Sequence, residues 1–311
     1  MFRSGPQDIA RRAGEANGHC RVLSLDGGGT KGYQTLGVLK EMETALGAPL
    51  GQNFRLIYGT STGACTAAFL GLGAEVDEIV AFYRRHIPAV LRETMPHAKA
   101  AALKAFCRKA FGKKDFSAFG TGIGIVATDW RRERPLILKT GSALPGEGCT
   151  IARAVRASCS AYPLFSACRI RLPSLGSLEL ADGSYCANNP VVFAIAEADE
   201  ALRQPRSSRR VISIGAGTYS IPAYQGMSRL IHLFKGVGLL QKTLGINTET
   251  AEQLRRASFP DVAVTRIDDY FGGHGLAVDF TEADELKLAQ LYQCGRRSFF
   301  RHENDLRSML D

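Results

Sequence analysis

Two glycine-rich segments contain residue types suited to acyl transfer. The first, Asp26–Gly32, reads DGGGTKG, and the second, Gly59–Gly63, reads GTSTG. A Gly-x-Ser-x-Gly sequence placed between a strand and a helix permits the sharp turn that exposes a serine hydroxyl, and it lets the next N–H face an oxyanion. The second segment therefore predicts a nucleophile, Ser61, whose turn is permitted by Gly59 and Gly63. The N–H of Thr62 is a candidate oxyanion donor.

A serine hydroxyl becomes a useful nucleophile only beside a base, and acyl transfer also needs donors for the developing oxyanion. Gly27, Gly28 and Gly29 present consecutive N–H groups before an expected helix, and such a geometry binds an oxyanion or a phosphate. For the base, Asp182 follows the apolar residues 178–181. Gly183 after it predicts a tight turn that fixes the carboxylate.

Two other chemistries stay open at this point. A Ser-Asp-His hydrolase would carry its histidine after Asp182, where the sequence has His232, His274 and His302. Residues 26–31 also resemble the first phosphate loop of sugar kinases and actin-like ATPases, and residues 211–218 resemble the second. That alternative leaves Gly59–Gly63 and Asp182 without a role.

The elements that must position these residues follow from hydrophobic patterning. Buried strands are expected at 20–26, 54–58, 122–128, 136–139, 170–172 and 211–214, and helices at 36–46, 64–72, 150–158 and 191–203. The order strand, glycine turn, helix occurs twice in succession. This order predicts an α/β fold in three layers, with a mainly parallel central sheet flanked by helices.

Composition narrows the class of protein and of partner. The net charge of +9 favours anionic partners in general. The eight cysteines form no CxxC pair, which disfavours a zinc site and predicts reduced thiols in a cytoplasmic protein. No run of about 18 apolar residues is present, so contact with a membrane would be peripheral. We expect an N-terminal segment, 1–19, and a single catalytic domain, 20–311.

Two segments outside the motifs suggest contact with lipid. Residues 91–114 interleave basic side chains with Leu103, Phe106 and Phe111, which predicts a surface helix or, alternatively, one that lies on an anionic membrane. Residues 228–245 are rich in apolar side chains and predict a core helix, with a lid over an acyl pocket as the alternative.

Taken together, the motifs resemble those of patatin-like phospholipases. That family has a DGGGxxG loop, a GxSxG turn and a DG turn in the order found here at 26–32, 59–63 and 182–183. Residues 157–163 and the Asn-Asn-Pro sequence at 188–190 are also similar. The resemblance covers roughly residues 20–220, and it leaves residues 220–311 as a lid or regulatory region.

The resemblance implies a catalytic dyad without histidine. Ser61 would attack the ester carbonyl, and Asp182 would accept its proton and later activate water. The oxyanion donors would be Gly27, Gly28 and Gly29, with Thr62 in addition. Lys31 stands where the family usually has arginine, so the bidentate fork is lost.

The resemblance also implies partners. The substrate would be membrane phospholipid, reached by peripheral contact at the inner membrane surface, with no cofactor, no metal and no nucleic acid. The chain is similar to bacterial effectors of this family that a cyclic nucleotide switches on in anti-phage defence. The candidates for that anionic site are Lys235, Lys242, Arg255 and Arg256. The alternative is a constitutive housekeeping lysophospholipase.

Overall fold

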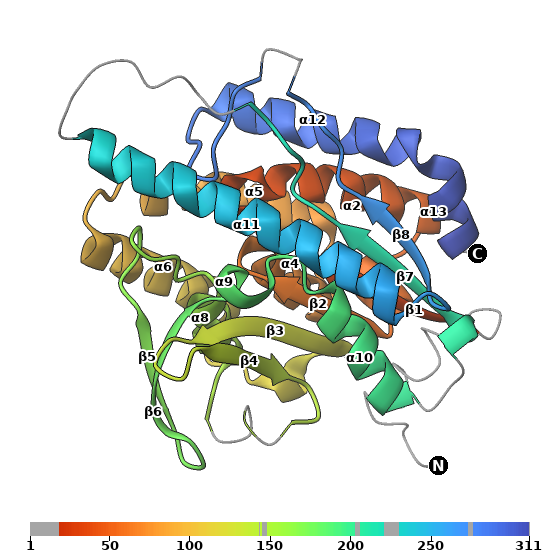
Figure 1. Cartoon of the computed structure of the whole chain (residues 1–311), viewed down its shortest axis with the longest axis horizontal. Helices are drawn as coiled ribbons and strands as arrows, with labels where there is room; N and C mark the ends of the chain where they lie inside the picture. Colours follow the sequence, from red (N-terminus) through yellow and green to blue (C-terminus); the bar gives the residue numbers. More distant parts are fainter. Residues whose placement is uncertain are drawn as a thin grey trace.

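An eight-stranded sheet forms the centre of the protein (Figure 1). The computed structural model describes residues 19–142, 144, 148–202, 206–220, 230–272 and 276–310, and it does not describe the side chains of 201–202 and 230–237. The strands are β1 (Cys20–Leu25), β2 (Leu56–Thr60), β3 (Gly122–Asp129), β4 (Arg134–Lys139), β5 (Cys168–Leu172), β6 (Gly176–Asp182), β7 (Arg209–Ile214) and β8 (Ala263–Ile267).

The sheet is parallel in its larger part. The strand order is β5-β6-β3-β2-β1-β7-β8, with β4 also paired to β3. The pairs that run from β3 to β8 are parallel, whereas β4, β5 and β6 pair in antiparallel fashion. This confirms the predicted α/β fold with a mainly parallel sheet.

Helices cover both faces of the sheet. They are α2 (Gly32–Leu46), α3 (Leu50–Asn53), α4 (Thr62–Gly71), α5 (Val76–Leu91), α6 (Pro96–Phe111), α8 (Ile151–Ser158), α9 (Ser184–Ala187), α10 (Val191–Leu202), α11 (Leu230–Ser258), α12 (Glu285–Arg301) and α13 (Glu303–Leu310). Short 3-10 turns are η2 (Gly29–Lys31), η3 (Phe116–Ala118) and η4 (Arg206–Ser208).

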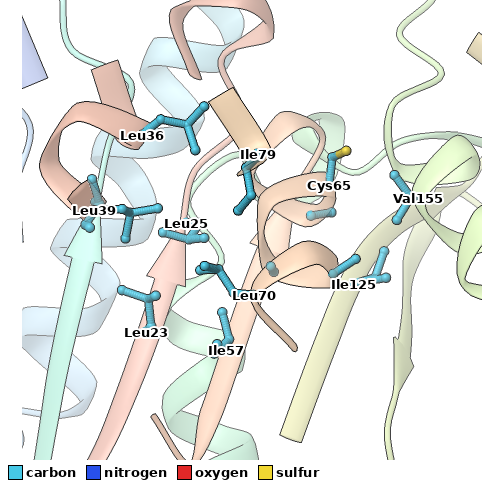
Figure 2. Packing of buried hydrophobic residues seen from close by; sticks show 14 of the residues in the cluster. Leu23, Leu25, Leu36, Leu39, Ile57, Cys65, Leu70, Ile79, Ile125 and Val155 are labelled. Atoms are coloured by element: carbon cyan, nitrogen blue, oxygen red, sulfur yellow. The ribbon is translucent and has the colours of Figure 1, made fainter. Parts of the chain in front are cut away.

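Alternation along β1 explains the two cores. Leu23 and Leu25 belong to the larger cluster, with residues of α2, α4 and α5 (Figure 2). Val22 points to the opposite face, where it joins the smaller cluster with Val191 and Ile195 of α10. A strand buried on both faces is expected to be apolar nearly throughout, as β1 is.

The sheet order also locates a binding site. The connection that leaves β1 leads to β2 on one side, and the connection that leaves β7 leads to β8 on the other, so a topological switch point lies between β1 and β7. In open α/β sheets, ligands bind outside the carboxyl ends of the strands at such a point. Gly27–Gly29 follow β1 and Ser61 follows β2, so both motifs meet at this edge.

Several elements differ from the predictions. Asp182 is the last residue of a strand, β6, which pairs with β3 and was expected only as a turn. The region 91–114 contains the end of α5 and then α6. Residues 230–245 belong to the single long helix α11, whereas 228 and 229 lie outside the described residues. Strand β8 and helices α12 and α13 were not predicted. Residues 1–18 lie outside the described part of the chain.

No helix in the described ranges combines the length and apolar character needed to cross a membrane.

Candidate active site

Ser61 occupies a strained turn between β2 and α4. Its φ of 53° and ψ of −121° lie in a region that non-glycine residues rarely adopt, and this is the strain expected of an exposed nucleophile. The flanking glycines are required by space. A Cβ atom on Gly59 would collide with the carbonyl oxygen of Gly63, and one on Gly63 would collide with that of Leu25. The GTSTG sequence therefore permits this turn because its glycines let the strand and helix backbones touch.

Asp182 lies within hydrogen-bonding distance of this serine. The Ser61 hydroxyl donates to Oδ2 of Asp182 at 2.7 Å, and Oδ1 accepts the backbone N–H of Ser184 at 2.8 Å. The Asp182 side chain is buried, and its burial raises the pKa to about 6, although the hydrogen bonds from Ser184 and Ser61 oppose that rise. The carboxylate is thus fixed in position and more basic than an ordinary aspartate.

The end of α8 holds both members of this pair. The hydroxyl of Ser158 accepts the backbone N–H of Ser61 at 2.8 Å, and its carbonyl oxygen accepts the N–H of Gly183 at 3.2 Å. The carbonyl oxygen of Ser160 accepts the N–H of Asp182 at 3.0 Å. The family-like segment 157–163 is therefore the scaffold that fixes the serine and the aspartate together.

The glycine loop lies beside the serine, but its amides are not equivalent. The N–H of Gly27 donates to the carbonyl oxygen of Asn188 at 3.0 Å. Among the described residues, the N–H groups of Gly28 and Gly29 meet no acceptor. The hydroxyl of Thr62 donates to the carbonyl oxygen of Gly29 at 2.9 Å and ties the loop to the serine turn. Two amides are thus free to meet an oxyanion, and the third already has a partner.

A buried ion pair anchors the base of this loop. The guanidinium of Arg266 binds both carboxylate oxygens of Asp26, at 2.8 and 2.6 Å, and it also contacts Asp268 at 2.6 Å. Burial lowers the pKa of Lys31, whose Nζ donates to the carbonyl oxygen of Gly217 at 3.4 Å. Arg266 was not among the predicted site residues, because its partner lies 240 positions away in the sequence.

Removing Arg266 is expected to destabilise the protein strongly. Arg266→Met leaves the Asp26 carboxylate buried without its cation, which should lower the free energy of unfolding by about 3–5 kcal/mol. Urea denaturation followed by circular dichroism measures this. The double variant Asp26→Asn/Arg266→Met should recover part of the loss, since position 26 then no longer carries a buried unpaired charge. An equal loss in both variants would show that packing, rather than charge, is what Arg266 supplies.

A cavity of about 330 Å³ opens above the serine and the glycine loop. Apolar side chains from α5, α6 and the segment after α8 form one wall: Ile87, Val90, Leu91, Leu103, Phe106, Leu164 and Phe165. Helix α11 supplies another wall through Leu240 and Leu244. A mostly apolar cavity whose lining includes the hydroxyl-bearing Ser61 can accept an acyl chain. Residues of both segments for which contact with lipid was the alternative interpretation, 91–114 and 228–245, thus line this cavity.

Helix α11 is also joined to the loop after β6. Asn247 accepts the N–H of Asn188 at 2.7 Å, and the hydroxyl of Thr248 accepts the side-chain amide of Asn188 at the same distance. Asn188 in turn holds Gly27. One residue therefore connects the helix over the cavity with the glycine loop.

The described side chains that were expected to bind an anionic ligand do not lie together. Lys242 lines the cavity. Arg255 and Arg256 both bind Glu252, at 2.5 and 3.1 Å, and neither lines the cavity. The side chain of Lys235 lies outside the described residues. The two arginines therefore share one carboxylate at a place away from the cavity.

The described side chains do not support the two other chemistries, a Ser-Asp-His triad at Ser61 or an ATPase-like phosphate loop at Asp26. His302 binds Asp269 at 2.9 Å, and no histidine lines the cavity in the part of the chain that the structure describes. The side chains of His232 and His274 lie outside that part. Asp26, the first residue of the ATPase-like loop, has both oxygens bound to Arg266. The glycine loop faces a serine–aspartate pair instead.

Comparison with known proteins identifies the family of this chain. The family described as patatin-like phospholipase matches residues 23–195. The chain is 46% identical, over 318 aligned positions and 99% of both chains, to a cUMP-AMP-activated phospholipase of Escherichia coli. A cGAMP-activated phospholipase of Pseudomonas aeruginosa is 53% identical over 55 residues, 18% of this chain and 16% of that one. Human calcium-independent phospholipase A2-gamma is 42% identical over 66 residues, 21% and 8% of the two chains. The present chain therefore belongs to the patatin-like phospholipase family of lipid hydrolases.

Proposed function

We propose that this enzyme cleaves fatty-acyl esters of membrane phospholipids, with Ser61 as nucleophile and Asp182 as base. The single observation that carries the proposal is the 2.7 Å hydrogen bond from the Ser61 hydroxyl to Asp182 in the lining of an apolar cavity. The enzyme would reach its substrate by peripheral contact with the inner surface of the cytoplasmic membrane.

The reaction has two halves. As the Ser61 oxygen attacks the ester carbonyl, its proton passes to Asp182, which then donates it to the departing lysophospholipid oxygen. A water molecule next gives a proton to Asp182 and attacks the acyl ester on Ser61. The bond between the acyl carbon and the Ser61 oxygen breaks, Asp182 returns the proton to that oxygen, and the fatty acid is released. The amides of Gly28 and Gly29 would donate to the oxyanion in both halves, and the N–H of Thr62 is a further candidate. Gly27 would join them only by releasing Asn188.

Burial of Asp182 suits this role. A general base works best when its pKa lies near the operating pH, and the pKa of about 6 leaves the carboxylate mostly ionised at pH 7 but basic enough to accept a proton. No histidine is then required.

The rate is expected to depend on pH through Asp182. Because only the ionised carboxylate can accept the proton, kcat/KM on a soluble ester should fall as the pH drops through about 6. Initial rates between pH 4.5 and 8.5 test this, and return to pH 7.5 should restore full activity. A rate that is constant down to pH 4.5 would mean that Asp182 is not the base.

We further propose that a cyclic nucleotide switches the enzyme on, as part of a defence against phage infection. The relative that covers 99% of the chain is named for activation by cUMP-AMP, and a shorter match is named for activation by cGAMP. A lipase that acts on its own cell's membrane needs such restraint, which a housekeeping lysophospholipase would lack.

Fatty-acid release from phosphatidylglycerol vesicles tests both proposals. The wild-type enzyme should release fatty acid when cUMP-AMP is added and little without it, and Ser61→Ala should release none under either condition. Equal release with and without cUMP-AMP and cGAMP would support the housekeeping alternative. ATP hydrolysis without any fatty-acid release would contradict the acyl-hydrolase function itself.

A further inference from the structure

A second concave surface is lined mainly by residues of α6, α8 and β5, and Figure 1 marks the positions of these three elements. This groove has a volume of about 630 Å³ and shares no lining residue with the catalytic cavity. All of its ionisable lining side chains are cations. They are Lys104, Arg108, Lys113, Arg153, Arg156, Arg169 and Arg171.

Most of these cations have no acidic partner. Within the described ranges, none of Lys104, Arg108, Lys113 and Arg171 forms a salt bridge. Glu179 approaches Arg169 at 3.5 Å, but it also meets Arg131 at 3.6 Å. So many like charges around one concavity repel each other, and an anion bound among them would relieve that repulsion.

One of the cations that line the groove carries an unsatisfied donor. Arg156 lines the groove, and its Nε atom is buried without a hydrogen-bond partner in the part of the chain described by the structure. A buried donor left without an acceptor costs about 1–3 kcal/mol. Arg153, one turn earlier on α8, has one of its guanidinium nitrogens bound to the carbonyl oxygen of Gly148 and is otherwise exposed.

The chemistry of these side chains selects the ligand class. Five of the seven cations are arginines, whose planar forks bind phosphate oxygens in a bidentate manner. A concave surface, unlike a flat one, also favours a compact anion that several side chains contact at once. We propose that this groove is a binding site for phosphodiester anions.

Helix α8 connects the groove with the catalytic pair. Arg153 and Arg156 lie on the helix whose last residue, Ser158, accepts the N–H of Ser61. The carbonyl oxygen of Arg156 accepts the hydroxyl of Ser160, and Ser160 holds the N–H of Asp182. An anion that fixes α8 from the groove therefore acts on the geometry of both catalytic residues. This coupling rests on the proposed function, whereas binding itself does not.

Two sources could present a phosphodiester to this groove: a soluble cyclic dinucleotide, or the headgroups of anionic phospholipid. The test uses Ser61→Ala protein, so that no substrate is consumed. Binding of cUMP-AMP is measured by calorimetry, and binding to phosphatidylglycerol vesicles by co-sedimentation. The groove variant is Lys104→Gln/Arg108→Gln. Its matched control, Lys109→Gln/Lys114→Gln, removes two exposed cations from the same region that do not line the groove.

The groove variant should bind at least one probe tenfold or more weakly than the control, which should match the parent. A loss confined to cUMP-AMP identifies a soluble ligand, and a loss confined to vesicles identifies the lipid headgroup. Equal affinities of the two variants for both probes would overturn the proposal, as would a parent that binds neither probe.

The coupling has its own readout in the Ser61-containing enzyme. Saturating the groove with the probe that binds should raise kcat for a soluble p-nitrophenyl ester in wild type and control, and not in the groove variant at the same probe concentration. Unchanged kcat in wild type at saturation would overturn the coupling. If the ester were hydrolysed equally well by Ser61→Ala, the proposed function would fail instead, and the binding result would be unaffected.

Discussion

Replacing Asp182 with asparagine is expected to lower kcat on the order of 10⁴-fold, the size of effect seen when the carboxylate of a serine hydrolase is neutralised. Asparagine keeps the shape of the side chain, and its oxygen can still accept the N–H of Ser184, at 2.8 Å from Oδ1 in the wild type. It cannot accept a proton from Ser61. The loss should therefore appear in kcat, with KM for a soluble ester nearly unchanged.

The same substitution should not destabilise the fold at pH 8. Because burial raises the pKa of Asp182 from 3.8 to about 6, the native state binds the proton more tightly than the unfolded state, and stability falls as the pH rises through that window. Above it, the ionised carboxylate costs the native state up to about 3 kcal/mol. Asparagine avoids this cost.

Urea denaturation at two pH values separates the two effects. At pH 8, Asp182→Asn should be at least as stable as wild type. At pH 4.5 its advantage should shrink, because the wild-type carboxyl group is then largely protonated as well. A variant that loses stability equally at both pH values would show that Asp182 is a structural residue whose charge contributes little.

Replacing Gly29 with alanine is expected to lower kcat on the order of 10²- to 10³-fold, the effect of removing one oxyanion donor. Gly29 has a φ of +57°, and a Cβ atom there would collide with the carbonyl oxygen of Phe280. The loop must move to relieve that collision, and the N–H of Gly29 moves with it. Since the N–H of Thr30 donates to the same carbonyl oxygen, at 3.0 Å, this movement also disturbs that hydrogen bond.

Gly47 supplies a matched control for the backbone strain. Its φ of +62° is similar, but no atom lies within 4 Å of the site of its Cβ. Gly47→Ala should therefore lower stability by about 1–2 kcal/mol and leave kcat unchanged. Thermal denaturation measures the stability of both variants, and ester hydrolysis measures their kcat. Equal kcat in the two variants would exclude Gly29 from the oxyanion site.

The local motifs could be predicted because each is a short segment with its own chemistry. The turn at Ser61 needs a glycine on each side of the strand-to-helix junction, and both glycines lie within the five residues 59–63. The glycine loop after β1 is equally local. Parallel strands that are buried on both faces read as apolar runs, which is why β1, β2 and β7 were expected close to where they occur.

The supporting residues could not be predicted in the same way. Ser158 lies 97 positions from the amide it holds, and Arg266 lies 240 positions from Asp26. Nothing in the local pattern of a serine or an arginine distinguishes such a partner from a solvated surface residue. The hydrogen bond from Gly27 to Asn188 is likewise a tertiary contact. Three consecutive glycines therefore looked alike in the sequence, although within the described residues only the amides of Gly28 and Gly29 lack an acceptor.

Strand β6 shows a different limit. Its residues alternate between buried and partly exposed positions over a short stretch, and a turn glycine follows at once. In sequence, a short antiparallel strand next to a DG pair resembles a segment that leads into a turn. Its pairing with β3, which places Asp182 opposite Ala127, is visible only in the assembled sheet.

Covalent trapping of the nucleophile tests the central claim most directly. The wild-type enzyme is treated with a fluorophosphonate, which reacts with activated serines, and peptide mass spectrometry locates the adduct. A phosphonylated Ser61 in the wild type, with labelling at least a hundredfold slower in Asp182→Asn, is the predicted result. An adduct on another residue, or equal labelling rates in the two proteins, would contradict the Ser61–Asp182 dyad.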